Sequence, residues 1–306
     1  MSRSDVDGIV DALREVRIQW RDDHQRLREP IAREFPSRDA LDRLVRQIKA
    51  ALFPLRLGPT ELRQEDEDEF VATSLHEALG ALHAQALLEL QQSRRHEGLG
   101  AAEVDRLAQV AVAAFTASLP DTRRLLDLDV VAAFQGDPAA TSVDEVLLCY
   151  PGVHAMINHR LAHTLYRQNL PLIARIIAEL AHAETGIDIH PGASIGPSFF
   201  IDHGTGVVIG ASAIIGRQVR LYQAVTLGAK RFPAHADGSL KKGLPRHPIV
   251  EDNVVIYAGA TILGRVTIGQ GAVIGGNVWI TDDVPAGASV TQAGSVKGSD
   301  PTAASR

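Results

Sequence analysis

Histidines with acidic or basic neighbours are the side chains best suited to chemistry in this chain. Asp202 precedes His203, Asp188 lies a little earlier, and Arg246 precedes His247. An imidazole can take up a proton near neutral pH, and a nearby carboxylate can fix its tautomer and stabilise the imidazolium that forms. An arginine is well shaped to hold a carboxylate through two hydrogen bonds. If the fold brings these residues together, they indicate acid–base chemistry on a small zwitterion.

Two other interpretations of the histidines stay open. Each ring could be a surface or corner residue that is satisfied locally. Alternatively, His190, His203 and His247 could hold zinc, which takes three or four ligands in proteins. No cysteine lies near these histidines, and we expect no metal. The single cysteine, Cys149, lies in an apolar helical stretch where a thiol is ordinarily inert, so we expect no cysteine nucleophile.

A six-residue repeat defines the elements that must position these residues. Repeats of this kind build solenoids in which each coil buries its aliphatic residue against the next coil. Ile-Gly pairs such as Ile195-Gly196 favour a left-handed parallel β-helix with a triangular cross-section, about three hexads per coil. Ordinary alternating strands are the alternative. The repeat places aliphatic residues at Ile189, Ile195, Ile201, Val207, Ala213, Val219 and Val225, and again at Val254, Ala260, Val266, Ala272, Val278, Val284 and Val290.

The repeat has a first irregularity beside the Asp202-His203 pair. The Ile-Gly register steps from Ile201 to Ile209, which is eight residues rather than six. Two extra residues therefore fall between them, and a bulged backbone of this kind re-aims side chains. Asp188 precedes His203 by nearly one coil, so we expect the two side chains to meet across stacked coils.

A longer interruption separates the two halves of the repeat. The stretch 229–247 contains Asp237-Gly238, a hairpin-turn signal. A basic segment on an otherwise acidic chain suggests an anionic ligand such as a phosphorylated cofactor. A solvated surface loop is the alternative. The basic residues of this arm are Lys230, Arg231, Lys241, Lys242 and Arg246.

Composition divides the chain near Thr185, because 19 of its 26 glycines lie beyond that residue. Net charge is −6, which argues against a general nucleic-acid binder. No apolar run reaches the roughly 18 residues of a membrane span, and no secretory signal core begins the chain. We therefore predict a cytoplasmic protein of 306 residues with no membrane or nucleic-acid partner.

The predicted fold class is α+β, with an all-helical domain at residues 1–185 and a β-helix at 186–292. The arm 229–247 is inserted in the β-helix, and 293–306 is a flexible tail. The helical domain caps one end of the coils, mediates assembly and contributes to the substrate site near 137–160. Thr185-Gly186 is a helix stop. Further helices are predicted from Val6 to Arg28 and over 67–95, 101–118, 122–134, 142–148, 153–167 and 170–184.

Five separated motifs resemble the bacterial serine O-acetyltransferases, a family of hexapeptide-repeat acyltransferases. The resemblance covers residues 135–292, whereas the first 120 residues share only their helical character. The motifs are Gly136-Asp137-Pro138-Ala139, Asp188-Ile189-His190-Pro191, Asp202-His203-Gly204-Thr205-Gly206, Val225-Thr226-Leu227-Gly228 and Arg246-His247-Pro248. The stretch Gly152-Val153-His154-Ala155 also resembles the family.

The resemblance implies direct transfer of an acetyl group from acetyl-CoA to the L-serine hydroxyl, the first step of cysteine biosynthesis. His203 matches the family's general base, and Asp188 matches the aspartate that orients it. Acetyl-CoA is a co-substrate, so no permanently bound cofactor is implied. The implied substrate-binding residues are Asp137, Asp202, Arg246 and His247, and the implied CoA-binding residues are Gly228, Ala229, Ala258, Lys230, Lys241 and Lys242. Ala229 stands where many relatives have a second glycine.

The same resemblance implies a homo-oligomer, either a trimer or a dimer of trimers. The family's terminal isoleucine, which docks into cysteine synthase, is absent, so we predict that this complex does not form by the usual route. Cysteine feedback inhibition is implied by the resemblance alone. Homoserine, a sugar or an antibiotic could replace serine, and succinyl-CoA could replace acetyl-CoA. A metal-dependent lyase or a non-catalytic scaffold on the same solenoid are further alternatives.

Overall fold

The computed structural model describes residues 3–24, 35–94, 97–231 and 233–292. It divides into two units at Phe35 and Pro36. The first unit contains helix α1 (Arg3–Asp23), whose described side chains are exposed. The second unit contains every other described element. The predicted tail 293–306 lies outside the described residues.

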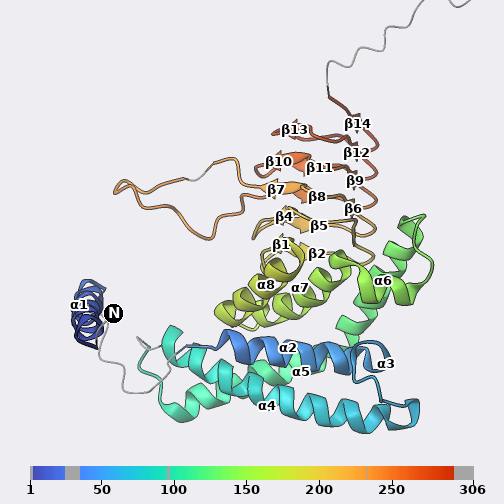
Figure 1. Ribbon diagram of the computed structural model, residues 1–306. Helices are drawn as coiled ribbons and strands as arrows, with labels where there is room; N and C mark the ends of the chain where they lie inside the picture. The colour runs from blue at the N-terminus through green and yellow to red at the C-terminus, as the bar shows by residue number, and fades with distance from the viewer. Residues whose placement is uncertain (1–2, 25–34, 95–96, 232, 293–306) are drawn as a thin grey trace, which may run out of the picture. The chain divides into compact units, whose positions relative to one another are not determined.

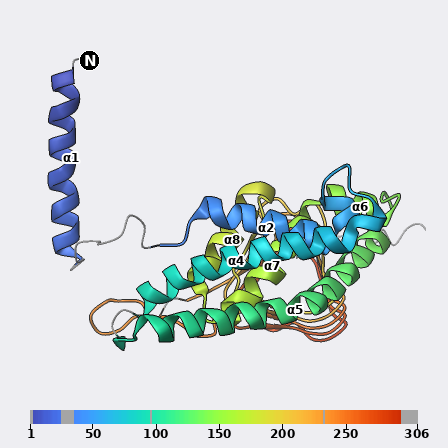
Figure 2. The ribbon, with the colours of Figure 1, turned by 90° about the horizontal axis from the view of Figure 1, so that it is seen from below.

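The second unit begins with a helical layer (Figures 1 and 2). Its helices share one apolar core, in which the largest fully buried side chains include Phe115, Leu82 and Leu161. The layer comprises α2 (Arg38–Leu52), α3 (Pro54–Leu57), a 3₁₀ turn (Gln64–Asp66), α4 (Glu67–Ser93), α5 (Ala101–Gly136), α6 (Val143–Cys149), α7 (Pro151–Arg167) and α8 (Pro171–Thr185).

Helix α5 corrects one prediction, because the two helices expected over 101–118 and 122–134 form a single helix that includes Pro120. A proline inside a helix removes one backbone hydrogen bond and ordinarily favours a break. Here the same face stays buried on both sides, from Phe115 and Leu119 to Leu126 and Val130. Packing of that face outweighs the local preference of one residue.

The solenoid consists of three parallel sheets that the chain visits in turn (Figure 1). Sheet A has the strand order β1-β4-β7-β10-β13, sheet B β11-β8-β5-β2, and sheet C β14-β12-β9-β6-β3. The strands are β1 (Asp188–Ile189), β2 (Ser194–Ile195), β3 (Phe200–Ile201), β4 (Val208–Ile209), β5 (Ile214–Ile215), β6 (Arg220–Leu221), β7 (Thr226–Gly228), β8 (Ile249–Val250), β9 (Val255–Ile256), β10 (Thr261–Leu263), β11 (Thr267–Ile268), β12 (Val273–Ile274), β13 (Trp279–Ile280) and β14 (Ser289–Val290).

The strand register shows where the repeat is irregular. Asp188 pairs with Val208, and Val208 pairs with Thr226, so the first coil contains two residues more than the second. The excess falls in the turn between β3 and β4, which contains Asp202 and His203. The predicted insertion is therefore confirmed.

Two corners of the solenoid are important below. The CA corner comprises the turns from sheet C to sheet A, which are 202–207, 222–225, 257–260 and 275–278. The AB corner comprises the turns from sheet A to sheet B, which are 190–193, 210–213 and 264–266 together with the arm and its end at 229–248. Sheet A spans the distance between the two corners, because every coil passes from one to the other through a strand of that sheet.

A buried ion pair joins the helices to the first coil. Arg160 of α7 donates to Asp129 of α5 at 2.6 and 2.9 Å, and its guanidinium also donates to the carbonyls of Ile195 and Gly196. Asp129 in turn accepts the backbone N–H of Phe199. Because these charges are buried, losing either partner would leave the other uncompensated. The helical layer is thus fixed to the coil that contains Asp188 and His203.

The C-terminal end of α8 agrees with the prediction from sequence. Gly186 follows α8 in the left-handed conformation, with φ of 70°, as expected of a helix stop. Among the described residues, no helix is both long and apolar enough to cross a lipid bilayer.

Candidate active site

His203 lies at the CA corner in an unusual backbone conformation. Its φ is 56°, in the left-handed region that few non-glycine residues adopt. Its side chain is 72% exposed, and its Nε2 lies 3.9 Å from Asp202 Oδ1. The insertion therefore presents this imidazole outward from the coil, where a substrate can reach it.

Asp137 and Tyr150 from the helical layer face the same corner. Tyr150 Oη donates to Asp137 Oδ2 at 2.5 Å, and Asp137 Oδ1 accepts the N–H of Ala139. The Tyr150 hydrogen bond lowers the pKa of Asp137, and the nearby His203 contributes in the same direction. The same bond raises the pKa of Tyr150 to about 12, and Asp202 contributes. The CA corner thus places two carboxylates, Asp137 and Asp202, and the hydroxyl of Tyr150 near His203.

A glycine allows the helical layer to approach this corner. A Cβ on Gly152, at the start of α7, would lie 2.2 Å from the carbonyl oxygen of Ile201. Only glycine fits so close to the strand that leads into Asp202 and His203. Tyr150, which precedes α7, is positioned by this contact.

His247 lies at the AB corner and is 7% exposed. Its Nδ1 accepts the backbone N–H of Ser212 at 3.1 Å, so the proton of the neutral ring is on Nε2. Burial, with Arg246 contributing next, lowers its pKa to about 4. A Cβ on Gly210 would lie 1.9 Å from the ring, so glycine is required there. His247 is therefore a fixed, neutral hydrogen-bond donor at neutral pH.

His190 lies beside His247 at the same corner. Its Nδ1 accepts the N–H of Gly192 at 2.9 Å, and its ring meets the edge of Tyr166. Burial lowers the pKa of His190, and the cation of Arg175 adds to the effect. The two imidazoles of the AB corner are thus both held as neutral donors.

Asp188 lies on β1, between the two corners. Its carboxylate is within 4.8 Å of ligand atoms of Glu179 and His182 on α8. In the described part of the chain, no hydrogen bond or ion pair joins Asp188 to His203. The backbone N–H of Asp188 donates to the carbonyl of Val207 at the end of the CA corner, and its orienting role stays a prediction.

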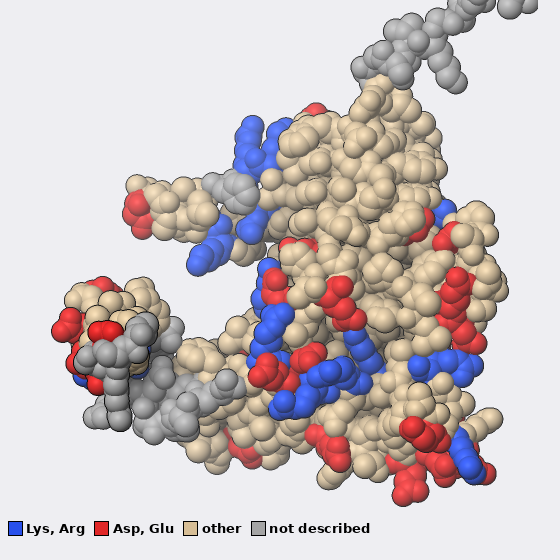
Figure 3. Space-filling view, viewed as in Figure 1, with Lys and Arg blue, Asp and Glu red and all other residues tan. Residues whose placement is uncertain are grey.

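The arm leaves sheet A at the AB corner and returns at His247. An antiparallel bridge joins Ala234 to Leu240, and Asp237 Oδ1 accepts the N–H of Ser239, which confirms the predicted turn. Lysines and arginines gather along the arm in Figure 3, whereas the solenoid face above it is almost uncharged. A pocket of about 490 Å³ opens between the arm and the corner. Lys241, Lys242, Arg246, His190 and His247 are among its lining residues.

The residues assigned to CoA divide between the two corners. Gly228 ends β7, and Ala229 and Lys230 begin the arm, so all three belong to the AB corner. Ala258 lies at the CA corner, where its carbonyl accepts the N–H of Asn277. A ligand that touched both sets within one chain would have to cross sheet A.

Within one chain, the predicted site residues therefore form two separate groups. The CA corner holds Asp137, Asp202 and His203, and the AB corner holds Arg246 and His247. A zinc site would require His190, His203 and His247 to converge, but His203 lies at the other corner. Cys149 ends α6, in agreement with the predicted helical stretch, and that stretch leaves it exposed.

Two residues at these corners were not identified from the sequence. Tyr150 precedes the Pro151-Gly152 start of α7, and its contact with Asp137 depends on tertiary packing. Ser212 lies directly beneath His247 in the coil register, since Ile214 pairs with Ile249. Counting the repeat across the arm would have identified Ser212, but the length of the arm conceals the register.

The fold and the repeat place the chain in a known class. Residues 247–282 match the family model described as bacterial transferase hexapeptide (six repeats). With three parallel sheets built from six-residue repeats, the chain is a hexapeptide-repeat transferase.

Similar proteins define the family within this class. The plasmid serine acetyltransferase of Synechococcus elongatus is 54% identical over 261 residues, which cover 84% of this chain and 82% of that protein. Serine acetyltransferase 1 of Entamoeba histolytica, solved with L-cysteine, has a TM-score of 0.71 at 37% identity, covering 81% of this chain and 86% of that one. A serine acetyltransferase solved with CoA has a TM-score of 0.51 at 27% identity, covering 82% and 95%.

The chain belongs to the serine acetyltransferase family. The predicted activity, serine O-acetyltransferase, and the predicted class, an acyl-CoA-dependent O-acyltransferase, are confirmed by these relatives.

Proposed function

We propose that this serine acetyltransferase works by direct attack with His203 as general base. Nε2 or Nδ1 of His203 takes the proton from the serine hydroxyl as the oxygen attacks the thioester carbonyl of acetyl-CoA. The C–S bond then breaks, the CoA sulfur leaves with the bonding electrons, and the imidazolium returns the proton to that sulfur. No enzyme nucleophile is needed. The observation that carries this proposal is the outward, 72% exposed imidazole at the inserted turn.

The two corners suit the two ends of serine. The Arg246 guanidinium and the Nε2–H of His247 are donors for the serine carboxylate. Asp137 and Asp202 are acceptors for its ammonium group. Because the hydrogen bond from Tyr150 keeps the pKa of Asp137 low, that carboxylate is charged at neutral pH. Serine bound in this way presents its hydroxyl toward His203.

The site requires a second copy of the chain, because one chain separates these two sets of residues. We propose a trimer in which the CA corner of one chain faces the AB corner of its neighbour, with Asp188 as the orienting carboxylate for an imidazole. Exposed apolar side chains on and beside sheet A support this contact, among them Trp279 at 71% and Tyr257 at 44% exposure. The six-residue repeat supports a left-handed coil.

Acetyl-CoA would lie in the cleft between neighbouring chains, with Gly228 and Ala229 from one chain and Ala258 from the other. A backbone N–H of Ala229 is the candidate donor for the thioester oxygen, since an oxyanion donor needs no side chain. Lys230, Lys241 and Lys242 would meet the CoA phosphates. Cysteine, which was bound in the Entamoeba structure, is the proposed competitor of serine. A cytoplasmic location is also part of the proposal.

A thiol-release assay tests the acceptor and the donor together. Purified full-length protein with acetyl-CoA should release free CoA thiol only when L-serine is present. Homoserine, a sugar and an aminoglycoside are the competing acceptors, and succinyl-CoA is the competing donor. If serine gives no release above background while another acceptor does, the proposed acceptor is wrong.

A further inference from the structure

A second pocket lies within the helical layer, apart from both corners. It has a volume of about 610 Å³ and opens between α2, α7 and α8. Its wall includes Val45 and Lys49 of α2, His154, Ile157 and Asn158 of α7, and Glu184 of α8. None of the residues assigned to serine or CoA lines it.

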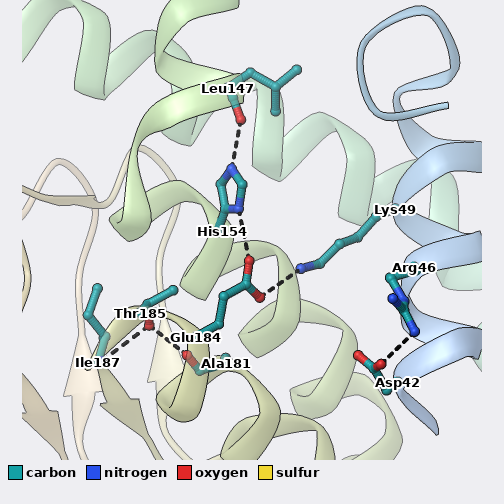
Figure 4. A network of polar contacts seen from close by, with 9 residues as sticks. All are labelled: Asp42, Arg46, Lys49, Leu147, His154, Ala181, Glu184, Thr185 and Ile187. Atoms are coloured by element: carbon teal, nitrogen blue, oxygen red, sulfur yellow. Dashed lines mark hydrogen bonds and ion pairs between the residues drawn. The ribbon is translucent and has the colours of Figure 1, made fainter. Parts of the chain in front are cut away.

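A line of polar side chains crosses this pocket (Figure 4). His154 places Nε2 at 3.2 Å from the carbonyl oxygen of Leu147 and Nδ1 at 3.4 Å from Glu184 Oε1. The other oxygen of Glu184 faces Lys49 Nζ, at 3.8 Å. The nearby Arg46 already pairs with Asp42 at 2.7 Å. Arg38 also lines the pocket, and its guanidinium donates to the carbonyl of Glu179. Lys49 and Glu184 are therefore left as a loose ion pair in the pocket wall.

Two polar groups in the pocket lack adequate partners. The Lys49 side chain is only 14% exposed, and 3.8 Å is too long for a hydrogen bond to Glu184. Burial lowers the pKa of Lys49. Asn158 is 1% exposed, and its Oδ1 has no hydrogen-bond partner among the described residues. A buried polar group without a hydrogen bond destabilises the fold, so a ligand that supplied the missing hydrogen bonds would bind favourably here.

We propose that this pocket binds a small L-amino acid. Its carboxylate would meet Lys49, and its ammonium group would donate to Asn158 Oδ1 and Glu184. A largely buried cation, Lys49, beside a half-exposed anion, Glu184, matches a zwitterion, whereas Glu184 would repel a phosphate or a dicarboxylate. Val45 and Ile157 offer an apolar wall for a short side chain. The binding part of this inference does not depend on the proposed mechanism.

The pocket is positioned to regulate the active site. Its α7 wall continues back through Gly152, which contacts β3, to Tyr150, which holds Asp137. Its α8 wall ends in Glu184, and the chain continues through Gly186 into Asp188 of β1. An amino acid that closes α2 onto α7 and α8 would therefore shift groups that hold serine. This regulatory part rests on the proposed function.

Calorimetric titration of the full-length protein tests binding. The proteinogenic L-amino acids other than serine and cysteine are titrated one at a time, each beside its amine and carboxylic acid analogues. We expect at least one amino acid to bind, its analogues to fail, and Lys49→Met to weaken binding roughly ten- to a hundredfold. Arg43→Met removes a charge from an exposed position on the same helix and should bind as the parent does.

Glu184→Gln is a second test that remains available if Lys49→Met fails to fold. It keeps the shape of the pocket, removes the negative charge of Glu184, and should weaken binding. Binding to no amino acid, or equal binding by the parent and both pocket variants, would overturn the proposal. A change of oligomeric state in Lys49→Met without amino-acid binding would overturn it too, by identifying the pocket as an interface. Binding without any change in serine-dependent turnover would refute the regulatory part alone.

Discussion

The two corners of the solenoid hold their histidines in opposite ways. At the CA corner the backbone alone presents His203, in a left-handed conformation with an exposed ring. At the AB corner the ring of His247 is buried, hydrogen-bonded at Nδ1 and packed over Gly210. The exposed imidazole is accessible to a substrate, whereas the buried one is fixed as a neutral donor. The same residue type therefore suits the two roles that we propose, catalysis at one corner and binding at the other.

This contrast has a physical basis in burial. Desolvation and the neighbouring Arg246 keep the His247 ring uncharged well below neutral pH, with a pKa of about 4. A group of that kind cannot serve as a base at neutral pH, but it donates a hydrogen bond without a change of charge. The comparison predicts that variants at the CA corner lower the rate, and that variants at the AB corner weaken substrate binding.

The largest expected effect is that of His203→Ala. Removing a general base lowers turnover by roughly 10² to 10⁴-fold, and the KM for serine should change much less. Steady-state kinetics of thiol release measure both quantities. His235→Ala on the exposed part of the arm is the matched control and should retain activity. Unchanged kcat in His203→Ala would remove this residue from the mechanism.

Mixing two inactive variants tests whether the corners come from different chains. His203→Ala damages only the CA corner, and Arg246→Ala damages only the AB corner. In a randomly mixed trimer about one site in four combines two intact corners, so activity should return on co-refolding. Mixing each variant with itself is the control. If the mixture stays inactive although mass measurements show mixed trimers, each site is built from one chain.

The arm should have a smaller effect, on acetyl-CoA alone. Lys241→Ala with Lys242→Ala should raise the KM for acetyl-CoA roughly two- to tenfold, because exposed ion pairs contribute little individually. The kcat and the KM for serine should stay near the parent values. Arg217→Ala, an exposed arginine paired with Asp252 on another corner, is the control. An unchanged KM, or an equal rise in the control, would contradict phosphate binding by the arm.

The smallest expected effect is a loss of stability in acid. Burial lowers the pKa of His159, His163, His190 and His247 in the folded chain. Between their unfolded pKa of about 6.5 and the folded value of about 4 for His247, the unfolded chain binds more protons. Stability should therefore fall as pH falls through this window. Thermal melts across it measure the slope, and His247→Gln should reduce it; equal slopes would show that His247 does not contribute.

Several features of the two corners were predictable because they are local in sequence. The six-residue repeat determines which residues face inward, and the step from Ile201 to Ile209 locates the insertion at His203. The Asp237-Gly238 turn follows from residue type. The continuity of α5 through Pro120 was not predictable, because the burial of one face over both halves decides it.

The division of the predicted site residues between two corners was also hidden from the sequence. The residues split because Asp202 and His203 lie in a turn before a strand of sheet A, whereas Arg246 and His247 lie in a turn after one. Tyr150 illustrates the same limit, since its bond to Asp137 depends on α7 packing against β3.

The sequence by itself determined the solenoid, its insertion and its arm, because each is encoded by a periodic pattern or its interruption. The motifs within that pattern also determined the family. Only the tertiary structure decided which histidine is exposed, which is a buried neutral donor, and that the predicted site residues divide between two corners of one chain. Burial and charge depend on neighbours from several elements, and no spacing along the chain reports them.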